Sequence, residues 1–443
     1  MVSASNFISA DKNALATSVD AFLPKFAFIP VAEDDSGASE VLVQEGDRVQ
    51  EGDVIAKLKG LNIHSSIPGV VQRIEQMQYV NGKQGLCVVI ALNGSFTYLG
   101  KKKEVQNWKN LEDSDIHLML KEAGVINTFA KNIPIYTQIE ELKKSKGSSV
   151  VVRLFDYDPS YVTDGFIARK NIPEIVEGAA VLAKAFGAKN ILFAYSSSEK
   201  NGIKAQLDEF LASKKESIFE KETEVLAAGV DTKKYPSGTM HDISAAVKKS
   251  CKDSVFAKLS KNDLFVDSVT ALASYNAVVI KKPVVSTFVH VTGECLNTAA
   301  LLNVRIGTPL RDIVEQCGGF KRKLSKIVIN GIIAGKAVGS LDIPVNRSVK
   351  SVEFIPASKI KVPSTENCIR CGNCRKICPV HLWPGNLYRI ARLDCQGVNS
   401  ERDRAAYESV LLCTECGLCN TVCSSRLPLS QTISILKDSY HEK

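Results

Sequence analysis

The sequence predicts a multidomain α+β protein. Its hydrophobic pattern changes twice along the 443 residues: short strand-like runs give way to strand–helix alternation, and then to a helical tail rich in cysteine. A chain of this length ordinarily holds several domains. No run of 18 apolar residues occurs, and residues 1–25 lack a basic start followed by an apolar core. We therefore expect neither a transmembrane helix nor a signal peptide.

The first domain, residues 1–100, is predicted to be built from short strands. Glu-Gly-Asp triplets at 45–47 and 51–53, and Pro68-Gly69, are turn signals between β runs. This pattern resembles a barrel-sandwich hybrid, the lipoyl-like fold of lipoyl and biotinyl carriers. Lys57 and Lys59 lie near the predicted hairpin, but their neighbours are not those of a carrier motif. We expect this domain to be a scaffold.

The second domain, residues 105–285, follows a lysine linker at 101–103. Its patterns predict a helix near 115–124, a strand at 149–155, a helix at 173–187, a strand at 190–195 and a helix at about 200–213. Pro173 is a typical first helical residue, and Gly187 is a typical residue after a helix end. Strand–helix–strand alternation of this kind indicates an open α/β sheet.

Two further domains complete the chain. Residues 286–348 are rich in strand patterns, with one short helix at 309–317. Residues 350–443 carry the cysteines, and helical patterns at 387–393 and 404–412 predict a helical ferredoxin-like domain. The five cysteines outside the two runs described next are expected to be small buried apolar residues: Cys87, Cys251, Cys295, Cys317 and Cys395.

Two matching cysteine runs near the C-terminus give the strongest chemical signal. The first is Cys368-x2-Cys371-x2-Cys374-x3-Cys378, followed by Pro379, and the second is Cys413-x2-Cys416-x2-Cys419-x3-Cys423. Three cysteines separated by two residues each can wrap one iron–sulfur cube, but the fourth ligand must come from elsewhere. The duplicated spacing predicts two [4Fe–4S] clusters and therefore an electron carrier.

In two-cluster ferredoxins the fourth cysteine of each run binds the other cluster. The predicted ligands of the first cluster are Cys368, Cys371, Cys374 and Cys423, and those of the second are Cys413, Cys416, Cys419 and Cys378. The alternatives are structural zinc, which usually needs two separated Cys-x2-Cys pairs, and disulfides, which need an oxidising compartment. Disulfides are not expected in a chain without a secretory signal, and a single structural cluster would not need the duplicated run; a metal site of another kind is the remaining alternative.

The charge balance is mildly basic. The formal net charge is +8, and two oxidised clusters with their thiolates would bring it to about +4. Such an excess fits an anionic membrane face, an acidic redox partner or an ordinary lysine-rich surface. Beside the first run, Arg370, Arg375 and Lys376 either raise the potential of the cluster or are simple surface charges. No interleaving of basic and aromatic residues indicates nucleic acid binding.

The order of these parts resembles the C subunit of the Rnf complex, the membrane-bound oxidoreductase that links ferredoxin and NAD to ion translocation. The second run, Cys-Thr-Glu-Cys-Gly-Leu-Cys at 413–419, and Leu-Pro-Leu at 427–429 look like the family pattern, although Ser424 stands where that pattern has proline after the last cysteine. Val-Thr-Gly at 291–293, Gly-Thr-Pro-Leu at 307–310 and Gly-Gly at 318–319 resemble its β-grasp (SLBB) domain. Tyr-Pro-Ser-Gly at 235–238 is similar to its Tyr-Pro-x-Gly motif. The resemblance implies a Rossmann-like NADH- and FMN-binding domain at 105–285 and an SLBB-like domain at 286–348.

The α/β domain departs from that family at its nucleotide site. The family's Gly-x-Gly-Gly-Ala-Gly-Phe-Pro loop corresponds here to Asn-Thr-Phe-Ala-Lys-Asn-Ile-Pro at 127–134, which keeps the proline and loses every glycine. A β-carbon at such a position forces the backbone away from phosphate, and Phe129 and Lys131 would fill the cofactor's space. The family's Glu-Cys-Glu-Pro appears as Asp156-Tyr157-Asp158-Pro159 with Asp164 downstream, and Gly-Gly-Pro-Met-Met-Gly is reduced to residues 330–335.

We therefore expect no FMN or NAD(H) in this chain; the alternative is a remodelled site that still binds a nucleotide weakly. The resemblance implies an electron-transfer subunit of an Rnf-type oxidoreductase, or translocase, peripheral on the cytoplasmic side of the membrane. Its partners would be the other subunits of the complex and a small redox protein, without nucleic acid. Two alternatives stay open: an NADH-dependent flavin and iron–sulfur oxidoreductase, either an NADH dehydrogenase module or cobalamin-reductase-like, and a non-redox scaffold with structural clusters.

Overall fold

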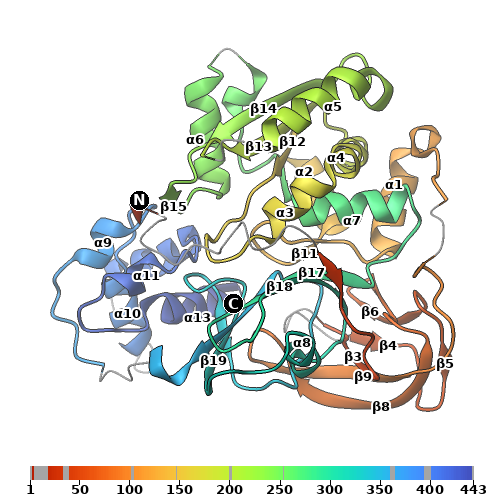
Figure 1. Ribbon diagram of the computed structural model, residues 1–443. Coiled ribbons are helices and arrows are strands. Elements are labelled where there is room, and N and C mark those ends of the chain that lie inside the picture. Colours follow the sequence, from red (N-terminus) through yellow and green to blue (C-terminus); the bar gives the residue numbers. More distant parts are fainter. Residues whose placement is uncertain are drawn as a thin grey trace.

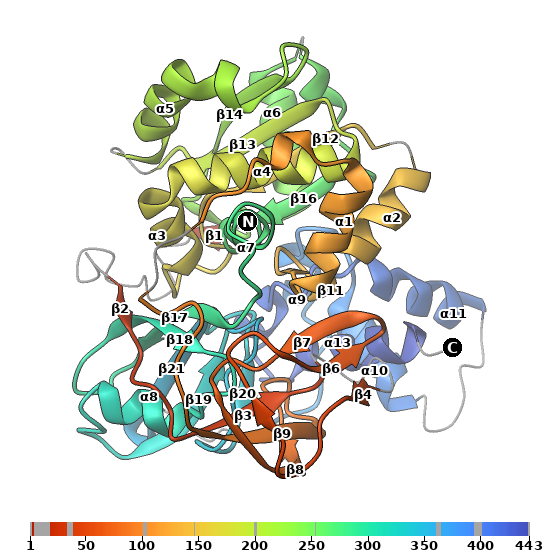
Figure 2. The same ribbon diagram turned by 90° about the vertical axis from the view of Figure 1, so that its right-hand side faces the viewer.

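The computed structural model describes residues 2–3, 18–32, 39–100, 104–145, 147–198, 202–252, 254–359, 365–393 and 401–441. The linker at 101–103 and Cys395 lie outside these residues. The α/β domain forms the upper part of the molecule, and the N-terminal barrel, a second sheet and the cysteine-bearing tail lie below it (Figures 1 and 2). None of the helices in the described part of the chain combines the length and the apolarity that a bilayer crossing requires.

The N-terminal barrel consists of two small sheets, ordered β3-β9-β8-β5 and β4-β6-β7. Its strands are β3 (Phe26–Pro30), β4 (Ser39–Val41), β5 (Arg48–Val49), β6 (Val54–Leu58), β7 (Leu61–His64), β8 (Gly69–Gln78) and β9 (Gln84–Leu92). Both Glu-Gly-Asp triplets form turns, because the N–H groups of Gln44 and Gln50 donate to the carboxylates of Asp47 and Asp53. The glycine of each triplet takes a positive φ, a conformation that a side chain would disfavour.

The hairpin that holds Lys57 and Lys59 is tied at its tip to the α/β domain. The hydroxyl of Tyr136, in α2 (Ile135–Lys144), donates a 2.5 Å hydrogen bond to the carbonyl oxygen of Lys59, and Tyr136 is buried with Leu61 and Ile126. A residue that carries a swinging prosthetic group has to move freely in solvent. The fixed tip is consistent with a scaffold role for the barrel.

The α/β domain has a four-stranded parallel sheet in the order β14-β13-β12-β16. Its elements, with the short helix and hairpin that precede it, are η2 (Trp108–Asn110), α1 (Asp113–Glu122), β10 (Ile126–Asn127), β11 (Ile133–Pro134), α2, β12 (Ser149–Arg153), α3 (Thr163–Lys170), α4 (Ile172–Phe186), β13 (Asn190–Ser196), α5 (Ile203–Ile218), β14 (Glu224–Val230), β15 (Lys234–Tyr235), α6 (Met240–Ser250), η3 (Val255–Lys258), β16 (Leu264–Asp267) and α7 (Ser268–Val278). Helices α4 and α7 pack on one face of the sheet, and α6 packs on the other.

Helix α4 illustrates how the sequence sets the bounds of an element. Pro173 stands in its first turn, where a missing N–H costs nothing, and Gly187 ends it in the left-handed conformation with φ 79°. Between these residues the side chains of Ile175, Ala179 and Leu182 are fully buried. The strand and helix bounds expected from the sequence agree with the structure to within a few residues.

The second sheet has six strands in the order β2-β18-β17-β21-β19-β20. Its elements are β2 (Val19–Asp20), β17 (Ser286–Thr292), β18 (Ala300–Arg305), α8 (Leu310–Gln316), β19 (Leu324–Ile329), β20 (Lys336–Val338), β21 (Ser351–Pro356) and the following η4 (Ala357–Lys359). Strand β21 pairs with both β17 and β19. The sheet therefore extends past residue 348, where the sequence patterns ended this domain, because β21 fills the gap between two earlier strands.

The tail is helical around its cysteines. It contains α9 (Asn373–Ile377), α10 (Pro384–Leu393), α11 (Glu401–Glu408), η6 (Ser409–Leu412), α12 (Leu418–Thr421) and α13 (Leu429–His441). A small core of Leu387, Ile390, Val410, Ile433 and Leu436 joins these helices. At the other end of the chain, β1 (Val2–Ser3) pairs with β15 of the α/β domain.

Candidate iron–sulfur centre

The two cysteine runs share one backbone conformation. Cys368 and Cys413 are 45 residues apart, and the same offset relates three pairs of residues with matching positive φ. These pairs are Arg370 (55°) with Glu415 (55°), Gly372 (77°) with Gly417 (72°), and His381 (57°) with Arg426 (54°). The glycine of each run begins a short helix, α9 or α12. The runs are thus a structural repeat as well as a sequence repeat.

Backbone N–H groups surround the sulfur atoms. The N–H of Glu415 donates to Cys413 Sγ at 3.4 Å, and that of Leu427 donates to Cys423 Sγ at 3.4 Å. In the first run the N–H of Asn373 lowers the pKa of Cys371. Such donors favour negative charge on sulfur, and they are the groups with which proteins tune iron–sulfur centres.

The fourth cysteine of the first run lies with the second run. Cys378 is near enough to Cys416 and Cys419 for their charges to interact, whereas Cys374 interacts in the same way with Cys368 and Cys371. Crosswise sharing of the fourth cysteine requires this kind of arrangement.

The last cysteine of the second run lies in a segment that folds back on the first. The Oγ of Ser424, the residue after Cys423, is 3.9 Å from Cys371 Sγ. The hydroxyl of Ser425 donates to the carbonyl oxygen of Asn367 at 2.9 Å. Cys423 is therefore held beside the first run, as Cys378 is held beside the second.

The cysteine side chains of the two groups are the kind of ligand that [4Fe–4S] clusters require. Each group offers thiol donors, and Gly385 approaches the first group so closely that a β-carbon there would lie 3.5 Å from Cys374 Sγ and 3.9 Å from Cys368 Sγ. Across the described residues, no three His, Cys, Asp or Glu side chains converge as they would around a single metal ion. A cube binds each thiolate through a different iron, so its ligands stand apart.

The two groups differ in exposure. Cys368 and Cys371 are exposed, whereas Cys416 is buried. Burial raises the pKa of Cys419 to about 12 and that of Cys413 to about 11. The first group therefore opens to solvent, and the second lies in a low-dielectric setting.

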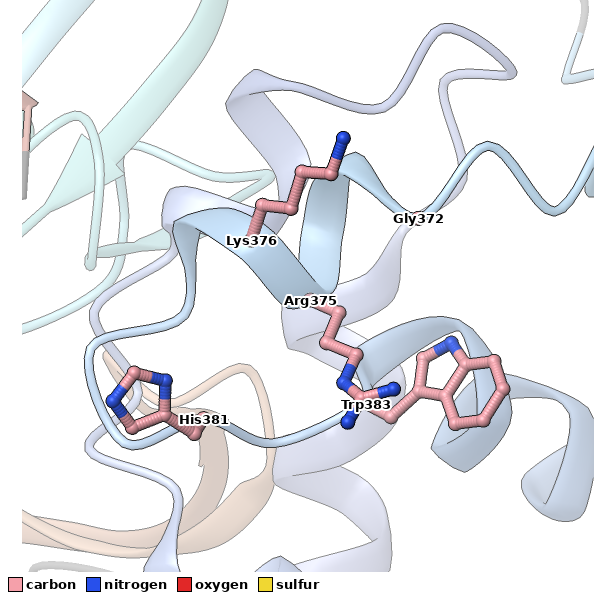
Figure 3. Close-up of a pocket in the computed structure, with 5 residues that line it drawn as sticks. All are labelled: Gly372, Arg375, Lys376, His381 and Trp383. Carbon is pink, nitrogen blue, oxygen red and sulfur yellow. The ribbon is translucent and has the colours of Figure 1, made fainter.

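Basic and aromatic side chains surround the exposed first run. Gly372, Arg375, Lys376, His381 and Trp383 border a hollow of about 640 Å³. The guanidinium of Arg375 lies 5.3 Å from the ring centre of Trp383, while Lys376 extends away from this pair (Figure 3). Of the basic residues singled out in the sequence, Arg375 and Lys376 line the hollow and Arg370 lies next to Cys371 in the chain.

The buried second run is contacted by the other domains. Tyr235, from the α/β domain, donates a 2.8 Å hydrogen bond from its hydroxyl to the carbonyl oxygen of Cys416. Ile333, from the loop after β19, packs against Tyr235, Cys416 and Leu418. The second run thus lies at a junction of the tail, the α/β domain and the six-stranded sheet.

At the position of the nucleotide-binding loop of the family that the sequence resembles, side chains of this protein fill the space. Residues 127–134 form the β10–β11 hairpin, in which Phe129 is buried with its ring centre 5.7 Å from that of Phe265. The guanidinium of Arg153 stacks over Phe129 at 4.4 Å and donates to the carbonyl oxygen of Gly238 at 2.9 Å. Arg153 and Phe129 together occupy the end of the parallel sheet, where open α/β sheets generally bind ligands.

Four buried charged residues form a network at this edge. Lys350, which immediately precedes β21, lies 2.8 Å from Asp164 and 2.6 Å from Asp267, and Arg153 lies about 4 Å from the same two carboxylates. Burial by itself would raise the pKa of Asp267, but Lys350 and Arg153 outweigh it and lower that pKa to about 2. Burial raises the pKa of Asp164 despite Lys350. The network links the α/β domain to the six-stranded sheet.

The acids retained from the family's acidic motif bind backbone groups of this protein. Asp156 accepts from the N–H of Asp164 at 2.7 Å and of Gly165 at 3.1 Å, in the first turn of α3. Asp158, fully buried, accepts from the N–H groups of Ile333 and Ala334 at 3.3 and 3.4 Å. Asp158 thereby holds the loop that packs on the second cysteine run.

The remaining space near this motif is small. A cavity of about 50 Å³ lies among Asp156, Tyr157, Tyr161, Thr232 and Tyr235. Pockets that hold cofactor-sized molecules generally measure about 300–1,000 Å³. This cavity is much smaller than such pockets and suits a few water molecules.

Comparison with known proteins matches three family models. They are described as RnfC Barrel sandwich hybrid domain at residues 11–95, SLBB domain at 288–334 and 4Fe-4S dicluster domain at 364–427. The chain thus contains a barrel-sandwich hybrid domain, an SLBB domain and a domain that matches the 4Fe-4S dicluster model, in a mixed α/β fold.

Curated relatives extend the match across most of the chain. The chain is 24% identical over 375 residues to the C subunit of the proton-translocating ferredoxin:NAD(+) oxidoreductase complex of Clostridium ljungdahlii, covering 84% of this chain and 80% of the relative. It is 22% identical to the Na(+)-translocating counterpart of Acetobacterium woodii (82% and 81% covered) and 26% identical to the C subunit of the ion-translocating oxidoreductase complex of Methanosarcina acetivorans (83% and 83% covered). These matches confirm the resemblance to the RnfC family.

Among solved structures, a chain of an NAD+-reducing [NiFe]-hydrogenase in the air-oxidised state aligns with a TM-score of 0.47 and 13% identity, over 74% of this chain and 66% of that one. The similarity is too distant to support an argument about this molecule.

The sequence singled out the cysteines and the basic residues beside the first run, but it did not predict the contacts of Arg153, Tyr235 and Lys350. Arg153 ends an apolar strand, and its position at the end of a parallel strand is a signal for a site residue. Tyr235 belongs to a recognised motif, yet its partner Cys416 is 181 residues away. Nothing in the local pattern of Lys350 predicts its burial.

Proposed function

We propose that this chain is the electron-transfer RnfC subunit of an Rnf-type ion-translocating oxidoreductase, and that it relays electrons through two [4Fe–4S] clusters. Cys368, Cys371, Cys374 and Cys423 bind one cluster; Cys413, Cys416, Cys419 and Cys378 bind the other. The observation that carries the proposal is the repeat of two thiol groups, each with the other run's last cysteine held beside it. When bound, the clusters supply one-electron chemistry.

The chain's own residues provide the setting for these clusters. Thiols hold them, loop N–H groups stabilise charge on sulfur, and the junction around Cys416 excludes water from the second. Cys419 also interacts with Cys374, a residue of the other group. The groups are therefore neighbours, so charge has a short path between them.

We further propose that the chain holds neither FMN nor NAD(H) and that its Rossmann-like domain, residues 105–285, is a scaffold. Phe129 and Arg153 fill the end of the sheet, and the cavity beside Asp156 is only about 50 Å³. The alternative, an NADH-dependent flavoenzyme, would need a site that these side chains occupy. We assign the remaining domains as a barrel-sandwich hybrid (1–100), a β-grasp SLBB domain (286–348, extended by β21) and a ferredoxin-like domain (350–443).

The location follows from the same proposal. We place the chain peripherally on the cytoplasmic side of the membrane, bound to the other subunits of the complex and without nucleic acid. It should co-purify with membranes and be released by high salt or a mild chaotrope. A need for detergent would contradict a peripheral location.

The test of the relay is a redox titration of anaerobically reconstituted protein. We expect about eight irons per chain, no zinc, and reversible reduction by dithionite. We expect NADH to leave the visible absorbance unchanged and FMN to show no stoichiometric binding. Zinc or about four irons would refute the two-cluster relay, irons that do not cycle would indicate a structural role, and bleaching by NADH would establish the flavoenzyme alternative.

A further inference from the structure

We propose that the exposed surface around the first cysteine run is the docking site for a small acidic iron–sulfur protein. This partner arrives reduced and is oxidised there as it gives one electron to the oxidised cluster of the first run. This inference rests on the proposed relay and adds the partner's chemistry and its place of contact. The surface, called the basic face below, comprises the lining of the hollow, namely Arg375, Lys376, His381 and Trp383, together with the exposed Ile369 and Arg370, which lie in the chain between Cys368 and Cys371.

The solvent exposure of the first cysteine run favours this face as the docking site. Electron transfer between proteins slows steeply with distance, so a partner's redox group has to approach the cluster closely. Cys368 and Cys371 are exposed, whereas Cys416 is buried beneath Tyr235 and Ile333. An external partner can therefore reach the first group, and the second is enclosed by the protein's own domains.

The local excess of basic side chains favours an acidic partner. Residues 365–393 contain five Arg and Lys side chains and one Glu, whereas the whole chain has 56 basic and 48 acidic residues. A cluster with four thiolates carries a net negative charge of about −2 and would by itself repel an acidic protein. The local basic excess reverses this repulsion and steers an acidic partner to the exposed thiols.

Two large apolar side chains of the basic face are exposed to solvent. Ile369 is 68% exposed and Trp383 is 52% exposed, although large apolar side chains usually avoid water. Arg375 stacks beside Trp383. Tryptophan and arginine within a polar rim are the residues most enriched where binding energy concentrates in protein interfaces.

The composition of the face favours a protein over a lipid surface. The hollow of about 640 Å³ is lined from α9 and from the segment that follows it, and the guanidinium of Arg375 lies over the ring of Trp383. A concave, partly ordered surface suits a protruding redox loop, whereas a lipid surface favours a flat or convex array of flexible lysines. Binding to anionic vesicles is the competing outcome of the test.

The test measures electron transfer by stopped flow between the reconstituted chain, with both clusters verified by iron content and spectra, and an acidic plant-type ferredoxin as the probe. We expect the second-order rate constant to fall at least tenfold between low and high salt. The double variant Arg375→Glu/Lys376→Glu should lower the rate at least tenfold at low salt and flatten its salt dependence. Trp383→Ala should lower the rate without changing the slope with salt.

The control variant is Lys214→Glu/Lys215→Glu, which makes the same charge change on exposed residues of α5, far from α9 (Figure 1). Its rate should stay within about twofold of the parent at equal ionic strength. Cluster potentials measured on both variants separate slower encounter from altered driving force.

Equal rates in both double variants, or a rate independent of salt, would overturn the docking site while leaving the relay intact. Binding of the parent, but not of the Arg375→Glu/Lys376→Glu variant, to phosphatidylserine vesicles, together with no reaction with the ferredoxin, would assign the face to the membrane instead. Loss of the clusters themselves would count against the proposed function and not against the face alone.

Discussion

The hydroxyl of Tyr235 donates a 2.8 Å hydrogen bond to the carbonyl oxygen of Cys416. Both residues are buried, and Tyr235 belongs to the α/β domain while Cys416 belongs to the second cysteine run. The bond therefore couples the α/β domain to the second cysteine run. This coupling gives the α/β domain a structural role in holding the second cysteine run.

Tyr235→Phe should destabilise the junction. The variant leaves the buried carbonyl of Cys416 without its donor, and the cost is about 1–2 kcal/mol of unfolding free energy. Urea unfolding followed by tyrosine fluorescence measures the effect. Tyr275→Phe, in α7 of the same domain, is the matched control and should change the midpoint much less. An equal loss of stability in both variants would show that removing the hydrogen bond to Cys416 costs no more than removing the hydroxyl of Tyr275.

The glycines at equivalent positions of the two runs should respond differently to alanine. Both have positive φ, so Gly372→Ala and Gly417→Ala each introduce backbone strain of about 1 kcal/mol. A β-carbon at Gly372 meets open space, whereas one at Gly417 would lie 2.1 Å from the carbonyl oxygen of Ile333. Gly417→Ala should therefore cost several kcal/mol and reduce cluster occupancy.

Iron content and thermal unfolding of the two alanine variants provide the measurement. Gly372→Ala should retain nearly full iron, and Gly417→Ala should lose part of it. Comparable stability in the pair would mean that the loop of Ile333 can move away without cost.

The crosswise assignment predicts which cysteine variants behave alike. Cys378→Ser should alter the same cluster as Cys416→Ser, because Cys378 lies with the second run. Cys423→Ser should alter the same cluster as Cys371→Ser. Electron paramagnetic resonance of the reduced variants distinguishes the two signals. If Cys378→Ser instead changes the signal that Cys371→Ser changes, each run binds its own cluster.

Lys350→Met should strongly destabilise the contact between the α/β domain and the six-stranded sheet. The substitution leaves Asp164 and Asp267 buried with Arg153 alone, and breaking a buried ion pair on one side generally costs about 3–5 kcal/mol. The double variant Lys350→Met/Asp164→Asn removes one of the uncompensated charges. Its loss in urea unfolding should be smaller than the sum of the single losses; simple additivity would show that the network is not coupled.

Acid should destabilise the protein through His290. Burial lowers the pKa of His290 from 6.5 to about 4, so below pH 6.5 the unfolded chain binds a proton that the folded chain excludes. Stability is then lost as the pH falls from about 6.5 towards 4. Between pH 7.5 and 5.5 this group accounts for about 1 kcal/mol of lost stability.

His290→Gln should remove that part of the pH dependence while His64, whose pKa is lowered to about 4 chiefly by burial, retains its own. Urea midpoints of the parent and the variant at both pH values give the difference. Parallel pH profiles would show that folding does not lower the pKa of His290.

Local patterns in the sequence were sufficient for much of the fold. The Glu-Gly-Asp turns of the barrel, the ends of α4 and both cysteine runs are set by residues close together in the chain, so their spacing predicts them. The sequence also located the stretch that lacks the family's glycines, and in the structure Phe129 of that stretch packs against Phe265.

Contacts between distant segments were not predictable in this way. Lys350 reaches Asp164 across 186 residues and Asp267 across 83. Such contacts depend on how the domains pack, and neither periodicity nor a motif reports that packing. The same holds for β21, whose place between β17 and β19 depends on two strands formed earlier in the chain.

The unequal enclosure of the two cysteine runs has a consequence for how the protein matures. An assembly factor that delivers iron and sulfide can reach Cys368 and Cys371 in the finished molecule, but Cys416 is accessible only before the tail docks against Tyr235 and Ile333. We therefore expect the proposed second cluster to be inserted first, during synthesis or soon after. Mild chelation of the mature protein should remove the proposed first cluster and spare the second. Simultaneous loss of both clusters would show that the docked tail opens readily.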